Sequence, residues 1–414
     1  MSVFIQLFPL LLQNLLSLFT NGLFWVILLV VGVQYRRMYR VSQNMFRMAD
    51  EPIWPVVLIV SLYGILGGIM GSVLLLFVGV SVLEVGLNYL WIVALILMFV
   101  QQRFLCFAYA GGVVAISNLL VGFPVVSIPH VMGLVAILHL VEALLIYLTG
   151  PLYPIPMYVK TKQGQVVGGY NLQKFWPLPL VALVAWYLPN QEVIQEAVKM
   201  PDWWPLLKTQ LATGQGELMY MMMPVVAALG YGDIALSELP REKTSRSALE
   251  LAGYSVVLLA LAILASHYPV LVALPALFGP LGHELLILLG QQREIKKEPI
   301  FVPPRQGIKV LHVLRKSPLR KLGLKDGDII LKINGQELNE DYELHSLLLE
   351  AGEIIEIEYL SGKGQKWHQG AVKREIDQPL GFIPVPRWHE GTYVEVTGSL
   401  SLVARWFKKV FKRN

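Results

Sequence analysis

The chain has 414 residues, of which 55% are hydrophobic and only 15% are charged, against about 25% charged residues in ordinary soluble domains. This composition excludes a simple water-soluble globule and a disordered chain. The formal charge of +5 comes from 34 basic and 29 acidic residues. So small an excess is typical of membrane-flanking loops, and we expect no nucleic-acid partner.

The first 22 residues are apolar. They lack the basic start and the small-residue cleavage site of a secretory signal peptide. Gln6, Gln13 and Asn14 interrupt the apolar run. We therefore expect residues 1–22 to lie in the membrane interface or to cross the membrane.

Residues 23–290 carry a succession of apolar segments, most of them near the ~20 residues that a helix needs to cross a bilayer. They predict an α-helical polytopic membrane domain with segments at 23–35, 55–80, 83–100, 104–121, 131–149, 177–189, 219–236, 250–266 and 269–289. Two segments are short. Prolines flank 177–189, and Gly230, Gly232 and Asp233 interrupt 219–236, so either segment is a candidate re-entrant loop.

Lysine and arginine are distributed unevenly between the loops. One set of alternate loops holds only Lys199 and Lys208, and the other set holds 11 basic residues. The 11 are Arg36, Arg37, Arg40, Arg47, Arg103, Lys160, Lys162, Lys174, Arg241, Lys243 and Arg246. Because short cytoplasmic loops are enriched in these residues, the richer side and the chain after the last span are predicted to be cytoplasmic.

Residues 300–386 differ in composition, with frequent charges and recurring turn signals. The Ser317-Pro318 pair predicts the start of a short helix, and Asn334-Gly335 predicts a tight turn. The region resembles the PDZ domain family through the run GIKVLHVLRKSPLRKLGLKDGDIILKINGQEL at 307–338. The resemblance implies a small α+β domain, a partly open β-barrel with two helices.

The same resemblance implies a peptide-binding groove. Pro379-Leu380-Gly381-Phe382 is similar to the loop that binds a ligand carboxylate, where glycine lets successive N–H groups face the ligand. The opposite wall would be a helix over 341–350, lined by Tyr342, His345 and Leu349. Pro384 lies in the strand that would pair with the peptide and has no N–H, so whether the groove binds a free C-terminus stays open.

Residues 387–414 form a tail with a basic amphipathic pattern. Trp406 and Phe407 lie on the apolar side, and the basic side carries Arg405, Lys408, Lys409 and Lys412. Such a helix suits an anionic lipid surface. The alternative is a helix that packs on the PDZ domain or on the spans.

The search for catalytic chemistry finds no motif that is complete. A zinc protease needs two histidines four residues apart and a glutamate, but the residue four after His283 is Ile287. Cys106 is the single cysteine and supports neither a disulfide nor a cysteine-based metal site. We therefore expect no catalytic residue, no cofactor and no metal.

Ionisable residues inside apolar segments are candidates for a proton or ion pathway. His139 and Glu142 share one helix face, and Glu84 or Asp233 would complete such a pathway. The alternative is a buried polar pair that fixes helix packing. Separately, a stripe of glycines predicts close contact with a neighbouring helix: Gly64, Gly67, Gly68 and Gly71.

Taken together, several features resemble the MinJ-like family of cell-division topological determinants of Gram-positive rods. They are the spans, GGYNLQKFWPLPL at 168–180, Gly282-His283-Glu284 and the C-terminal PDZ domain. The resemblance implies a non-enzymatic scaffold in the plasma membrane, at the septum and poles, that links a DivIVA-like protein to a MinD-like ATPase in septum site determination. It leaves a homo-oligomer open.

Two other function classes remain. One is an intramembrane metalloprotease-like protein whose active site is absent or decayed. The other is a transporter or channel with a regulatory PDZ domain. The missing second histidine argues against the first, and the second requires the ionisable residues named above to converge on one cavity.

Overall fold

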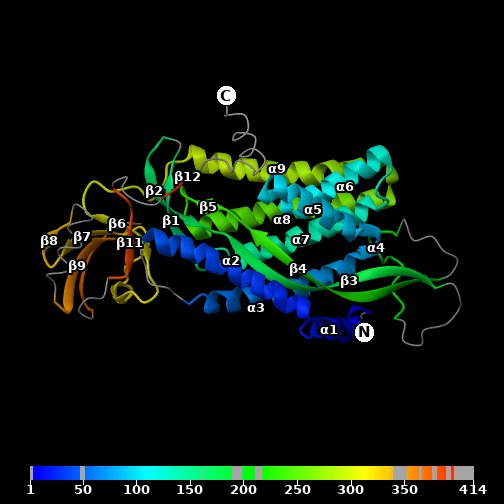
Figure 1. Ribbon diagram of the computed structural model, residues 1–414, viewed down its shortest axis with the longest axis horizontal. Helices are drawn as coiled ribbons and strands as arrows, with labels where there is room; N and C mark the ends of the chain where they lie inside the picture. Colours follow the sequence, from blue (N-terminus) through cyan, green and yellow to red (C-terminus); the bar gives the residue numbers. More distant parts are fainter. Residues whose placement is uncertain are drawn as a thin grey trace, which may run out of the picture.

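The structure, a computed structural model, describes residues 3–46, 52–161, 163–188, 198–209, 217–338, 352–362, 366–374, 380–387 and 393–395. A helical unit and a small β domain lie at opposite ends of the long axis, and α9 runs along one side of the helical unit (Figure 1). The helices are α1 Val3–Leu18, α2 Gly22–Phe46, α3 Trp54–Val78, α4 Val82–Val85, α5 Leu87–Val100, α6 Phe107–Val121, α7 Ile128–Thr149, α8 Pro240–His267 and α9 Ala273–Lys296.

The described residues include four helical stretches that are long and apolar enough to cross a membrane: α3, α7, α8 and the stretch Pro269–Lys296 that contains α9. Helices α1 and α2 form a bent pair, with an angle of 65°, that passes the same test together, and α5 and α6 are shorter. Helix α7 is the most enclosed. On α3 the leucines Leu58, Leu62 and Leu66 are exposed while the glycine stripe is buried, the reverse of a water-soluble helix.

Two of the predicted apolar spans are strands. β3 (Lys174–Leu188) and β4 (Glu217–Tyr231) form one long antiparallel pair, so the prediction of helical spans at 177–189 and 219–236 is wrong. Proline explains the difference, because Pro177, Pro179 and Pro224 would each break a helix interior. The prolines fit the hairpin because each lies at a position whose backbone points away from the partner strand.

The outer edge of β3 faces α3, and most of its outward-pointing amides donate to a hydroxyl group or are replaced by proline. Alternate amides of β3 point away from β4, and the two at Pro177 and Pro179 are replaced by proline nitrogens that need no acceptor. Three others donate to hydroxyl groups: Phe175 to Tyr35 at 3.2 Å, Val181 to Ser72 at 2.8 Å and Ala185 to Ser81 at 3.1 Å. A strand edge without such partners would be costly among apolar helices.

The glycine stripe of α3 serves two neighbours. Gly64 and Gly68 face the carbonyl oxygens of Pro177 and Pro179 in β3, whereas Gly67 and Gly71 also face side chains of α7. The predicted close contact is therefore present, but half of it is with a strand instead of a helix. A helix can approach a strand this closely only where no side chain intervenes.

The small β domain is built on the sheet order β10-β9-β7-β6-β11. Its strands are β6 Ile308–Val313, β7 Ile329–Ile333, β8 Gln336–Glu337, β9 Ile354–Leu360, β10 Trp367–Lys373 and β11 Phe382–Pro384. Between β6 and β7 lies the short helix η3 (Pro318–Leu322), capped by Ser317 and ended by Gly323 at φ +82°. The helix start and the turn lie where the Ser317-Pro318 and Asn334-Gly335 pairs predict them.

A third β element lies between the other two. β1 (Ile155–Lys160) and β2 (Val166–Asn171) form a hairpin, flanked by β5 (Ile234–Ala235) and β12 (Val394–Glu395) in the order β12-β1-β2-β5. Figure 1 shows this sheet between the helices and the β domain. The sequence alone predicts only a loop between spans for residues 155–171.

Candidate functional site

The described part of the predicted peptide site is the loop before β11. The carbonyl oxygen of Leu380 accepts a hydrogen bond from Ser317 Oγ at 2.6 Å, and that of Gly381 accepts one from the Leu314 amide at 2.8 Å. Because a trans peptide unit points its C=O and N–H in opposite directions, the amides of Gly381 and Phe382 face away from Ser317 and Leu314. Gly381 has φ +70°, a conformation that glycine adopts without strain.

The other predicted site residues lie outside the part of the chain that the structure describes. These are Tyr342, His345 and Leu349 on the expected groove helix, and Arg405, Trp406, Phe407, Lys408, Lys409 and Lys412 in the tail. The groove helix and the membrane-surface tail therefore stay predictions.

At Pro384, the last residue of β11, the outer edge of the strand already accepts a hydrogen bond. The Val385 amide donates to the carbonyl of Lys309 in β6 at 2.8 Å, so the carbonyl of Pro384 in the same peptide unit points away from β6. There it accepts a hydrogen bond from the hydroxyl of Tyr158, in β1, at 2.8 Å. The edge that a bound peptide would use is thus limited to Phe382, because Ile383 pairs with His312 of β6.

A second tyrosine of the hairpin contacts β6, the neighbour of β11. The hydroxyl of Tyr170, in β2, donates to Asp326 Oδ2 at 2.8 Å and also contacts the carbonyl of Leu311. Burial raises the pKa of Asp326, but hydrogen bonds from His312, Tyr170 and the Val313 amide outweigh burial and hold it below its usual value of 3.8. The carboxylate is therefore charged at neutral pH.

Further contacts join the hairpin to the β domain and its approach. The Gly168 amide donates to the carbonyl of Phe301 at 3.0 Å, and the Phe301 ring packs edge-on against Tyr170. The guanidinium of Arg315 lies 3.9 Å from the centre of the Tyr153 ring. The β domain is thus docked on the helical unit through side chains of the segment 153–170.

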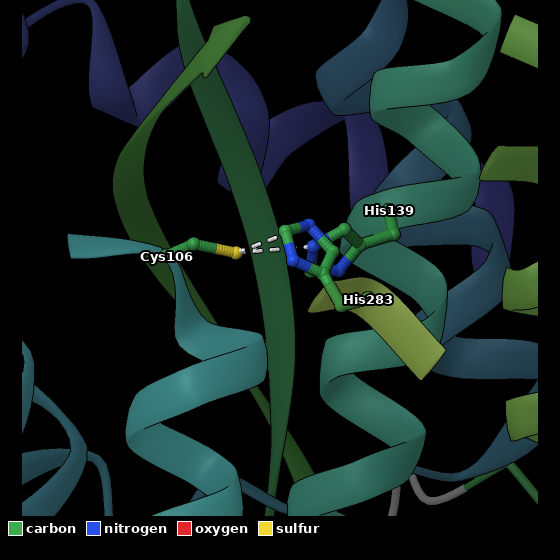
Figure 2. A group of neighbouring side chains, drawn as sticks. All are labelled: Cys106, His139 and His283. Atoms are coloured by element: carbon green, nitrogen blue, oxygen red, sulfur yellow. Dashed lines mark hydrogen bonds between the residues drawn. The ribbon is translucent and has the colours of Figure 1, made fainter. Parts of the chain in front are cut away.

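A separate polar group lies inside the helical unit. Figure 2 shows Cys106, just before α6, His139 of α7 and His283 of α9 pointing toward one another. Cys106 Sγ is 3.1 Å from His139 Nε2 and 3.8 Å from His283 Nε2, and all three ligand atoms lie within 4.8 Å of one another. A metal ion is the ligand that such a set can hold.

The glutamate beside this group is engaged elsewhere. Glu284 forms a salt bridge with Arg103 at 2.9 Å and accepts a hydrogen bond from the Tyr109 hydroxyl at 2.5 Å. Arg103, counted above as a loop residue, therefore pairs with a residue inside α9. Glu284 is not poised as the water-activating base of a protease.

Two of the ionisable residues that a transport pathway would need, His139 and Asp233, have different partners. His139 joins the cysteine group, whereas Asp233 pairs with Lys243 at the start of α8 at 3.3 Å. Lys243 is buried and also pairs with Glu294 of α9 at 3.3 Å. Within the residues that the structure describes, His139 and Asp233 therefore have different hydrogen-bond and ion-pair partners.

Comparison with known proteins supports the reading of the C-terminal region. The sequence model of the PDZ domain family matches residues 288–362. β11 lies beyond this match, yet it pairs with β6 in the same sheet. The chain therefore carries a PDZ domain whose last strand comes late in the sequence.

Among curated proteins, the chain is 23% identical over 273 residues to the cell division topological determinant MinJ of Bacillus subtilis (strain 168). The match covers 63% of this chain and 62% of that protein, so the chain spans under two thirds of the relative's length. The chain is thus MinJ-like over this region and contains a PDZ domain, which is consistent with a cell-division scaffold.

Solved structures that match are PDZ domains of SdrC-like proteins from Listeria monocytogenes and Listeria innocua. Each is 23% identical with a TM-score of 0.18 and covers 20% of this chain, and the match includes 92% and 98% of those two chains.

Proposed function

We propose that the chain is a non-enzymatic scaffold in the plasma membrane that presents a PDZ domain to the cytoplasm at division septa and poles. The observation that carries the proposal is the docked PDZ domain, which Tyr158 and Tyr170 hold on the helical unit. A domain fixed in this way offers a binding surface at a set place beside the membrane. The similarity to MinJ supplies the cell-division context.

The membrane position and orientation rest on composition. Four described helical stretches and a bent pair have the length and apolarity of spans, and their outer faces carry exposed leucine and valine. One hairpin replaces two expected spans. Since the number of membrane crossings changes by an even number, the basic loops and the PDZ domain stay on the same side of the membrane. That side is the cytoplasm.

For the ligand, we propose a short C-terminal peptide. The amides of Gly381 and Phe382 supply the carboxylate site, and Phe382 supplies the pairing edge. The Tyr158 hydroxyl already donates to the carbonyl of Pro384. Only the last few residues of a ligand can therefore pair with β11. The proposed protein partners are DivIVA-like and MinD-like division proteins, and the proposed lipid partner is anionic lipid at the tail.

The proposal is tested by recovery of partners from membranes of a Gram-positive rod. Full-length chain and a chain lacking residues 300–386 are cross-linked and purified in parallel, with equal membrane insertion as the control. We expect division proteins with the full chain and their loss with the deletion. Recovery of no division protein by the full chain contradicts the scaffold function, and equal recovery by both contradicts the role of the PDZ domain.

A further inference from the structure

We propose that Cys106, His139 and His283 form a zinc-binding site. Around a tetrahedral zinc ion with Zn–S of about 2.3 Å and Zn–N of about 2.0–2.1 Å, neighbouring ligand atoms lie roughly 3.3–3.6 Å apart. The sulfur-to-nitrogen distances of 3.1 and 3.8 Å bracket this spacing. The sulfur-to-nitrogen distances therefore need to change by only a few tenths of an ångström, and the histidine nitrogens, which lie within 4.8 Å of each other, would close toward the same spacing.

The ligand atom of His139 is free to accept a metal. The Nδ1 atom of His139 lies 2.7 Å from the carbonyl of Val135, which fixes its proton there and leaves Nε2 as an acceptor facing the sulfur. Cys106 is the N-cap of α6, and its Sγ accepts the Ala108 amide at 3.4 Å.

One thiolate and two imidazoles are a donor set that suits zinc. Because Arg103 and Tyr109 hold Glu284, the carboxylate does not complete the set, and a bound ion keeps one position for water or another small ligand. The Arg103–Glu284 pair is partly exposed and lies beside the site, which provides a polar approach for the ion.

Binding at this site would join three elements that are distant in the sequence. α9 is the helix that leads into the PDZ domain, and its only buried residues are Pro275, Ala276 and Gly279 within the described chain. Zinc on His283 would attach the middle of α9 to α7 and to the start of α6. The inference is independent of the scaffold proposal, since the PDZ domain could bind partners with or without the ion.

The first test is elemental analysis of full-length protein that carries a tag without histidine, after incubation with zinc sulfate and removal of excess metal. We expect about one zinc ion per chain. His139→Ala, His283→Ala and Cys106→Ala should each weaken zinc binding by more than about tenfold. His267→Ala, at an exposed histidine of α8, is the matched control and should retain zinc.

The second test uses wild-type protein only, so it does not depend on how the variants fold. Cys106 is the single cysteine, and any thiol label reports on this site. We expect a chelator to speed alkylation of Cys106, zinc to slow it again, and cobalt to give a sulfur-to-metal charge-transfer band. Absence of zinc from loaded wild-type protein, or alkylation that zinc leaves unchanged, overturns the proposal.

Discussion

The carbonyl oxygen of Pro179 lies where a side chain on Gly68 would have to be: a Cβ atom built on Gly68 would stand 2.1 Å from it. The corresponding distance from Gly64 to the Pro177 oxygen is 2.3 Å. Helix α3 therefore rests directly on the backbone of β3. Backbone atoms on both sides leave little room for adjustment, so these two positions require glycine.

Gly68→Ala should lower stability by about 1–3 kcal/mol, because the added methyl group has only backbone to displace. Gly32→Ala is the control: its Cβ would meet nothing within 4 Å, and alanine favours helix by about 1 kcal/mol. Thermal unfolding of the two variants in the same detergent measures the difference. Equal unfolding temperatures would show that α3 does not pack on β3 in this way.

Tyr158→Phe removes one hydrogen bond between β1 and β11. The contribution of such a bond is about 1 kcal/mol, so amide hydrogen exchange in β11 should quicken by roughly fivefold. Tyr147→Phe, at an exposed tyrosine of α7, should leave the exchange unchanged. If Tyr158→Phe also leaves it unchanged, the hairpin does not hold this edge.

Asp326 makes the docking sensitive to acid. Its pKa is lower in the folded chain than in the unfolded chain, so its contribution to stability is complete above about pH 4 and is lost as pH falls further. The stability difference between wild type and Asp326→Asn should thus be largest at pH 7 and shrink toward pH 3. Glu337→Gln, an exposed position, should show no such trend, as unfolding temperatures across this pH range will reveal.

Lys243→Met should destabilise the chain by about 3–5 kcal/mol, since it leaves the carboxylates of Asp233 and Glu294 without their shared cation. Lys297→Met, which breaks the more exposed pair with Glu238, should cost about 0–1 kcal/mol. Unfolding midpoints of the two variants give the comparison. A small effect at Lys243 would mean that the pairs are not formed.

The tail prediction is tested with a peptide of residues 399–413. It should sediment with anionic vesicles at low salt and be released as salt rises, because each basic residue contributes about 1 kcal/mol near such a surface. The same peptide with Lys408, Lys409 and Lys412 changed to Glu is the control and should stay in solution. Wild-type peptide that ignores anionic vesicles would indicate a packing helix instead.

The parts of the structure that the sequence predicts are those specified locally. The helix start at Ser317-Pro318 and the turn at Asn334-Gly335 both depend on neighbours within a few residues. The β3–β4 pair is different. A short apolar run is compatible with a helix or a buried strand by periodicity alone, and only its prolines signal the strand.

The cysteine–histidine group shows a second limit. Cys106, His139 and His283 are separated by 33 and 144 positions, and no spacing rule joins residues on three different elements. The docking tyrosines are similar, since Tyr158 and Tyr170 lie in a region that the sequence predicts only as a loop, and they contact residues more than 140 positions away. Only tertiary packing brings such residues together.

The alternating prolines of β3 also determine how the hairpin can pair. If β3 slid along β4 by one residue, Pro177 and Pro179 would turn inward, where the ladder needs donors that proline lacks. At the same time, amides that now face β4 would face α3 without acceptors. The longer the slipped segment, the more amides would lose their acceptors. The two prolines therefore favour the observed alignment of the whole hairpin.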